Sequence, residues 1–372
     1  MLSYLWRCYS AAQAILRYFG HLGYRTLGLL SRIFPLFIGD SPFKLEKHDD
    51  LEANVPVDIA SKNSNCDTYT VRLQPQSDLE IVGVGGSGQV YKVGDQVVLK
   101  TCRIFERPGN GASDNARWHY ASDTLFHANL LQNERTVLRL LQQRPHPHVI
   151  EAVDTDQPEG IYLRKYQPLA RPIPAQPQRV RWYRDLTGAL CHIHRLGIAH
   201  ADVRIDNVLF DEQGYAILCD FSAASPLGQP NLVLPDLPLP INGPSPTLSE
   251  ATDMFAMASL IFQVEHGTKP ELFVDSHGTL VLPEIRTGYQ SINMIIRNAW
   301  LGNYNHTSEM LEHLRSIDAN DDRGAHGIRM HSESAELLRD QVRKWRESRE
   351  KKFGKDFHTY YLFLFLDDQQ DF

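Results

Sequence analysis

The chain has 372 residues, of which 42% are hydrophobic, so it is long enough to bury a large core. Its formal net charge of -7 argues against nucleic acid as a partner, because nucleic-acid binding needs a basic surface. The five cysteines are scattered without a Cys-x-x-Cys pair, which indicates a reducing compartment and no structural zinc site.

The first expected element is a basic, apolar segment over residues 1–39. It contains four arginines and no acidic residue, and no uncharged run approaches the ~18 residues of a membrane-spanning helix. Three interpretations remain open: an amphipathic helix on a membrane surface, a mitochondrial presequence, and a helix that docks on the rest of the chain. The expected location is intracellular: cytoplasmic, membrane-associated or mitochondrial. A polar linker is expected over residues 40–76.

Residues 81–100 carry a glycine pattern between two strand-like runs. The pattern Gly-x-Gly-x-x-Gly-x-Val is formed by Gly83, Gly85, Gly88 and Val90. Glycines let a backbone turn tightly over phosphate groups. The same spacing occurs in dinucleotide-binding folds, but there a helix follows the glycines. Here a strand, a Gly94-Asp95 turn and the apolar run 96–100 follow, which predicts a β-hairpin.

A helix is predicted over Leu125–Gln143, where apolar residues recur at spacings of three and four. Glu134 lies within it. The preceding residues, 106–123, are rich in Gly, Asn, Asp and Ser, and they are expected to form an inserted mobile loop.

Two later segments place acidic and amide side chains at a spacing that suits phosphoryl transfer. Asp202 is followed five residues on by Asn207, and Asp220 begins the sequence Asp-Phe-Ser. Each segment alone is weak evidence for such a site, since polar residues of this kind usually form turns. Their order, after a glycine loop and a strand that ends in Lys100, predicts an enzyme that uses ATP.

Taken together, these motifs resemble the eukaryotic protein kinase family over about two thirds of the chain. The resemblance implies an α+β, bilobal domain over residues 77–318. Its N-lobe, residues 77–166, would be β-rich with one helix, and its C-lobe, residues 167–318, would be larger and helical. Residues 253–262 resemble the central C-lobe helix, whose aspartate braces the catalytic loop. Residues 160–166 resemble the strand that enters the hinge between the lobes, so backbone groups near residues 165–167 would meet adenine.

The resemblance also implies a role for each site residue, with ATP and Mg²⁺ as cofactors and a protein as substrate. Asp202 would accept the proton of the substrate hydroxyl, and Arg204 would neutralise the transferring phosphate. Lys100 would hold the α- and β-phosphates and pair with Glu134. Magnesium would be held by Asn207 and Asp220. The nucleotide would be enclosed by Gly83, Gly85, Gly88, Val90 and Val98.

Several departures from the family pattern are visible. Ala201 stands where many kinases have the arginine that pairs with a phosphorylated activation segment, so activity is not expected to need phosphorylation of residues 222–249. Ser222 replaces the glycine of Asp-Phe-Gly. The Ala-Pro-Glu motif and its arginine partner are both absent, and losing both halves of a buried ion pair can be nearly neutral. The double absence indicates a coherent variant fold.

The C-terminal part, residues 319–372, is expected to contain a charged helix and an apolar tail. The helix is predicted over Ser332–Phe353, and its basic run is mixed with acids, which favours a solvated face. The tail at residues 360–366 is expected to pack on the protein or on a partner.

Three functions follow from the sequence. The first is a protein kinase that phosphorylates serine or threonine. The second is a pseudokinase used as a binding module, which the missing Ala-Pro-Glu favours. The third is a small-molecule kinase of the aminoglycoside or choline type, which the Phe221 of Asp-Phe-Ser and the short C-lobe disfavour.

Overall fold

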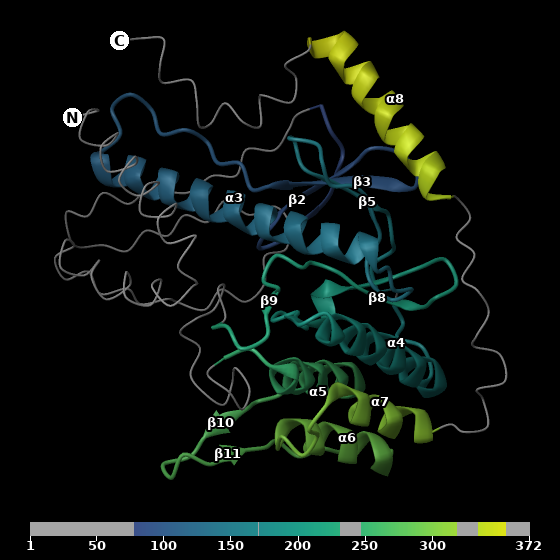
Figure 1. Cartoon of the computed structure of the whole chain (residues 1–372). Coiled ribbons are helices and arrows are strands. Elements are labelled where there is room, and N and C mark those ends of the chain that lie inside the picture. The colour runs from purple at the N-terminus through teal and green to yellow at the C-terminus, as the bar shows by residue number, and fades with distance from the viewer. Residues whose placement is uncertain (1–77, 170, 231–246, 318–333, 355–372) are drawn as a thin grey trace. The chain divides into compact units, whose positions relative to one another are not determined.

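The computed structural model describes residues 78–169, 171–230, 247–317 and 334–354 (Figure 1). The predictions for residues 1–39, for the linker at 40–76 and for the apolar tail lie outside the described residues. Within the described ranges, no helix combines the length and the apolar character that crossing a membrane requires.

An antiparallel five-stranded sheet forms the N-terminal region, in the strand order β1-β2-β3-β5-β4. Its strands are β1 (Ile81–Val84), β2 (Gly88–Lys92), β3 (Val97–Cys102), β4 (Ala152–Asp154) and β5 (Ile161–Arg164). The predicted hairpin is confirmed, because β2 pairs with β3 across the Gly94-Asp95 turn. Side chains of β3 alternate between two faces, so Val98 and Lys100 point to one side and Val97 and Leu99 to the other.

Helix α3 (Asp114–Gln143) crosses one face of this sheet (Figure 1). The helix was expected to begin at Leu125, and the loop expected over residues 106–123 is wrong from Asp114 onward. The chain turns helical earlier because Ser113 caps the helix, accepting a hydrogen bond from the N–H of Ala116 at 3.2 Å. The glycines and the proline that disfavour a helix all precede this cap.

The C-terminal region is mainly helical. Its helices are α4 (Gln176–Arg195), α5 (Glu250–His266), α6 (Gln290–Trp300) and α7 (Thr307–Ser316). The shorter elements are β6 (Ile198–Ala199), the 3₁₀ turn Ile205–Asn207, β7 (Val208–Phe210), β8 (Ala216–Leu218), β9 (Ser225–Pro226), β10 (Phe273–Val274) and β11 (Leu280–Val281). One hydrophobic core joins the helices to the inner face of the N-terminal sheet. The mixed α+β class with a β-rich and a helical region is therefore confirmed.

The charged helix predicted near the C-terminus is present as α8 (Ala335–Phe353). One face of it is not solvated. Leu338 and Val342 are buried against the outer face of the sheet, in a cluster with Val97, Leu99, Val153 and Tyr162.

Candidate active site

Three ionisable side chains from distant parts of the chain meet at the inner face of the sheet. The Nζ of Lys100 lies 2.6 Å from Oε2 of Glu134 on α3 and 3.0 Å from Oδ1 of Asp220. The Lys100 and Glu134 side chains are almost fully buried. The partner predicted for Lys100 is thus in contact with it, and the aspartate predicted to bind metal joins the same cluster.

The electrostatics of this cluster keep the lysine charged. Burial acts to lower the pKa of Lys100, but the Glu134 and Asp220 carboxylates outweigh it and raise that pKa above its usual value. Burial likewise acts to raise the pKa of Asp220, yet the Lys100 ammonium and hydrogen bonds hold it well below its usual range. For Glu134, burial prevails and the pKa is raised. A fixed ammonium beside an ionised Asp220 is suited to holding phosphate groups and a divalent cation.

The segment after Asp220 is packed inward. Phe221 is fully buried, lies edge-on to the His200 ring with centroids 4.9 Å apart, and donates its N–H to Oε1 of Glu134 at 3.3 Å. Asn133, beside Glu134, donates from Nδ2 to the Ser222 and Ala224 carbonyls at 2.9 and 2.8 Å. Asn133 was not singled out from the sequence, since no motif marks it. These bonds tie α3 directly to the segment that carries Asp220.

Asp202 and Asn207 lie together in the loop between β6 and β7. The Nδ2 of Asn207 donates to the Asp202 backbone carbonyl and to its Oδ2, both at 2.8 Å. The 3₁₀ turn at Ile205–Asn207 brings the two side chains onto one side of the loop. Arg204 forms an exposed ion pair with Asp206, through Nε at 3.0 Å among other contacts. Its action on a transferring phosphate stays a prediction.

Asp253 at the start of α5 braces the loop, as expected. Its carboxylate accepts the N–H of His200 at 2.7 Å and the N–H of Ala201 at 2.9 Å. Ala201 has φ of 65°, a left-handed conformation that costs a non-glycine residue about 1–2 kcal/mol. His194 completes the network, with Nε2 2.9 Å from Asp253 and Nδ1 2.7 Å from the Thr307 hydroxyl.

Asp253→Asn is therefore expected to lower the free energy of unfolding by about 2–4 kcal/mol, because an amide donor would face a buried backbone donor. It should also reduce any phosphoryl transfer, since Ala201 precedes Asp202. Urea denaturation with Asp114→Asn as an exposed control measures the first effect. A loss no larger than that of the control would show that the brace is unimportant.

The glycine-rich loop is held by polar contacts. A side chain at Gly88 would collide with the Thr101 carbonyl oxygen, whereas one at Gly83 would meet nothing within 4 Å. The Ser87 hydroxyl donates to Oδ2 of Asp220 at 3.0 Å, and Nε of Arg103 donates to the Gly85 carbonyl at 2.8 Å. The protein's own packing thus requires glycine at Gly88, while Gly83 leaves space beside the loop. Ser87 was missed from the sequence, because serine in such a loop usually only turns the backbone.

Ser87→Ala is expected to lower the Mg²⁺ concentration needed for half-maximal nucleotide binding by about 2- to 10-fold, since the hydroxyl competes for the Asp220 carboxylate through one hydrogen bond. A magnesium titration of fluorescent-nucleotide binding measures this, with Ser87→Thr retaining the hydroxyl. An unchanged or raised requirement in Ser87→Ala would refute the competition.

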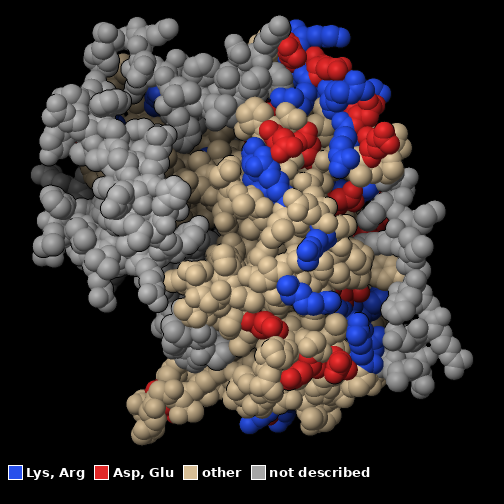
Figure 2. All heavy atoms as spheres, viewed as in Figure 1, with Lys and Arg blue, Asp and Glu red and all other residues tan. Residues whose placement is uncertain are grey.

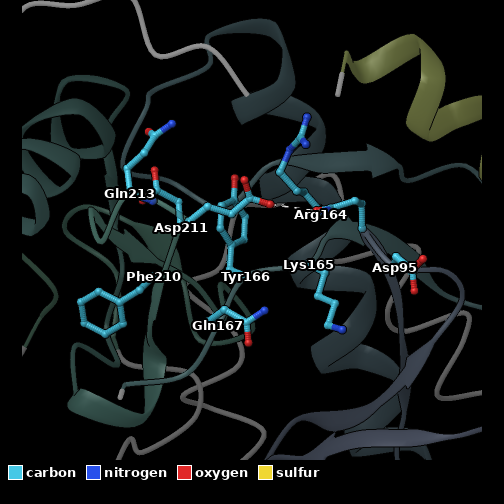
Figure 3. A pocket seen from close by; sticks show the side chains of 10 residues that line it. Asp95, Arg164, Lys165, Tyr166, Gln167, Phe210, Asp211 and Gln213 are labelled. Atoms are coloured by element: carbon cyan, nitrogen blue, oxygen red, sulfur yellow. Dashed lines mark hydrogen bonds between the residues drawn. The ribbon is translucent and has the colours of Figure 1, made fainter. Parts of the chain in front are cut away.

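The segment expected to meet adenine is only partly available. The N–H of Lys165 donates to the Gln96 carbonyl at 2.8 Å, and the N–H of Gln167 donates to the Phe210 carbonyl at 2.8 Å. Adenine contacts would therefore fall to other backbone groups of this segment. This segment also lines a pocket together with the β2–β3 and β7–β8 turns (Figure 3). The residues that line this pocket are Asp95, Gln96, Arg164, Lys165, Tyr166, Gln167, Phe210, Asp211, Glu212 and Gln213.

Another carboxylate links the start of α5 to the start of α7. Glu250, in the first turn of α5, accepts the N–H of Thr307 at 2.7 Å and lies 3.3 Å from Nδ1 of His306. It thereby caps the N-terminus of α7. That the double absence reflects a coherent variant fold stays a prediction.

Comparison with known proteins agrees with this architecture. The model of the protein kinase domain matches residues 77–349, and the chain belongs to this family.

Individual relatives are distant. A CBL-interacting protein kinase 22 of Oryza sativa subsp. japonica is 26% identical over 187 residues, which cover 45% of this chain and 41% of that protein. The serine/threonine-protein kinase PknE of Mycobacterium tuberculosis is 29% identical over 160 residues, covering 39% and 25%. The DNA damage-responsive serine/threonine-protein kinase RqkA of Deinococcus radiodurans is 27% identical over 223 residues, covering 52% and 30%. The chain spans less than half the length of each.

Proposed function

We propose that this protein kinase transfers the γ-phosphate of ATP to a serine or threonine hydroxyl of a protein. The observation that carries the proposal is the simultaneous contact of Lys100 with Glu134 and Asp220. These two contacts place a buried cation beside an acidic side chain, which is the combination that binding of a metal-nucleotide complex requires. Two of the relatives reported above are named as serine/threonine kinases, which supports the choice of hydroxyl.

The residues present fit ATP and Mg²⁺. Gly83 leaves open space beside the loop, and Lys100 provides a buried cation. Among the described residues no group of three or more His, Cys, Asp or Glu side chains could hold a metal alone, so Mg²⁺ would need phosphate oxygens beside Asn207 and Asp220. Bound in this way, Mg²⁺ and ATP would supply the charge neutralisation and the phosphoryl group.

The chain's own residues would do the rest. The Lys100 ammonium, kept charged by its two carboxylates, would orient the α- and β-phosphates. Asp202, held by a hydrogen bond from Asn207, would accept the proton of the attacking hydroxyl. The Asp253 brace would fix the position of that carboxylate through the loop backbone.

The test is phosphate transfer by the purified full chain with Mg·ATP. Casein and myelin basic protein would be offered beside choline and kanamycin, and the products hydrolysed to phosphoamino acids. Phosphoserine or phosphothreonine that disappears with EDTA is the expected result. Transfer only to the small molecules would instead identify a small-molecule kinase.

One observation favours a pseudokinase as the second candidate. The Ser87 hydroxyl occupies the Asp220 carboxylate, where a metal would bind. If nucleotide binds with no transfer to any substrate or to water, this candidate replaces the first.

A further inference from the structure

Helix α8 covers the face of the N-terminal sheet that points away from Lys100. Its buried residues Leu338 and Val342 lie about one turn apart and enter the cluster formed by the outer side chains of β3, β4 and β5. Trp345 adds an edge-on contact with the Tyr162 ring, with centroids 5.9 Å apart and planes at 75°. Figure 2 shows charged side chains gathered over the region where α8 lies in Figure 1. The helix is thus packed on one side and charged on the other.

A buried carboxylate joins this helix to the turn between β4 and β5. Glu159 has no exposed side-chain surface; it accepts the Tyr162 hydroxyl at 2.6 Å and pairs with Nε of Arg346 at 2.7 Å. A carboxylate removed from water needs a cation at such a distance to remain ionised without a large penalty. Arg346 on α8 supplies that cation. A second ion pair, from Arg349 to Asp78 at 2.8 Å, fixes the same helix near the start of β1.

The residue after Glu159 touches the strand that carries Lys100. A side chain at Gly160 would collide with the Lys100 carbonyl oxygen, so the two backbones lie in close contact. Ile161, the next residue, pairs directly with Lys100 across the sheet. A shift of this turn would therefore displace the backbone of Lys100.

The same turn also holds α3. Arg135, the neighbour of Glu134, donates to the Gln157 carbonyl at 2.7 Å and to the Gly160 carbonyl at 3.2 Å. Arg139, one turn further on, donates to the Thr155 carbonyl at 3.2 Å. The β4–β5 turn is accordingly bonded to α8 through Glu159, to α3 through its carbonyls and to β3 through Gly160.

We propose that Arg346 is a positioning residue for the Lys100–Glu134 ion pair and that α8 braces the active site from outside the cleft. Neutralising Glu159 keeps the β4–β5 turn in place, and this turn sets both the strand of Lys100 and the helix of Glu134. The effect on catalysis rests on the proposed phosphoryl transfer. The effect on the geometry of α3 does not.

The test compares two neighbouring arginines of α8 in the full chain. Arg346→Gln removes the cation that is ion-paired with Glu159, whereas Arg343→Gln removes an exposed arginine that pairs with Asp340. At a temperature where both variants are fully folded, Arg346→Gln should reduce kcat/KM for ATP on the order of 10- to 100-fold, because small displacements of catalytic groups have effects of this size. Arg343→Gln should stay within about twofold of the wild type.

Rescue separates charge neutralisation from simple docking. The double variant Arg346→Gln/Glu159→Gln has no stranded carboxylate and should recover most of the lost kcat/KM. Arg346→Lys keeps the charge but not the planar group and should fall between the wild type and Arg346→Gln. A double variant as impaired as Arg346→Gln, or more so, would contradict the charge argument.

Amide hydrogen exchange gives a readout that needs no activity. Arg346→Gln should speed exchange by at least about fivefold in α3 around Glu134 as well as in the β4–β5 turn, while Arg343→Gln changes neither. Faster exchange confined to α8 and the turn, with kcat/KM unchanged, would overturn the proposal and leave α8 a purely structural element. If the wild type transfers no phosphate, the proposed function fails, and the exchange result alone still decides whether Arg346 positions α3.

Discussion

Lys100→Met is expected to abolish phosphoryl transfer and to lower the free energy of unfolding by about 3–5 kcal/mol at neutral pH. The wild-type Glu134 side chain is 1% exposed and its carboxylate contacts the Lys100 ammonium, so the substitution leaves a buried charge without its cation. Asp220 would also lose its ammonium partner, because the methionine side chain is apolar. Lys92→Met is the matched control on the neighbouring strand, because Lys92 is partly exposed and pairs with the exposed Glu80 at 3.6 Å.

The stability loss should depend on pH in a defined direction. Burial already raises the pKa of Glu134, with Lys100 opposing, so removing Lys100 raises that pKa further. The folded variant then binds a proton more tightly than the unfolded chain, and its stability is recovered as pH falls toward the ordinary carboxyl pKa. Urea denaturation at pH 8 and pH 5.5 measures the difference between wild type and variant. A gap that widens at the lower pH would contradict the assignment of the stranded charge to Glu134.

Asp202→Asn should reduce kcat by about 10²- to 10⁴-fold, the usual contribution of a general base. The amide oxygen can still accept from Asn207, so the loop geometry and the binding of Mg·ATP are expected to persist. Isothermal titration with Mg·ATP and steady-state kinetics on the same preparation separate the two effects. A variant that loses nucleotide binding in parallel with turnover would show that Asp202 has a structural role instead.

Combining the two substitutions gives a further check on the site. Residues that stabilise one transition state do not contribute additively. The residual activity of Lys100→Met/Asp202→Asn should therefore lie within a few-fold of that of the less active single variant. Losses that multiply would indicate that the two side chains act in separate steps.

The candidate site residues could be predicted because each belongs to a motif with fixed spacing. The contact between Lys100 and Glu134 meets the prediction, although Glu134 lies 34 positions beyond Lys100 in the numbering, whereas the contact of Asp220 with the same ammonium was not predicted. Gly88 was marked by spacing alone, and its close contact with Thr101 supplies the reason. Each motif can be recognised from a few neighbouring residues. The order of the strands and helices that carry the motifs then leaves few ways to bring their side chains together.

Other features could not be predicted, because their signals are weak or depend on distant partners. The early start of α3 depends on one capping serine in a polar stretch that otherwise reads as a loop. The docking face of α8 consists of two buried side chains in a highly charged helix, so its pattern suggests full solvation. Glu250 caps α7 from more than fifty residues away, and no motif marks it.

The most direct test of the central claim is a single-turnover experiment with the full chain in excess over γ-labelled ATP, in the presence of Mg²⁺ and a protein substrate. The proposed mechanism predicts that the label moves in one exponential phase into acid-stable phosphoserine or phosphothreonine, and that Asp202→Asn slows this phase by about 10²-fold or more. Label that remains in ATP, or that leaves the wild type and Asp202→Asn at the same rate, would contradict it.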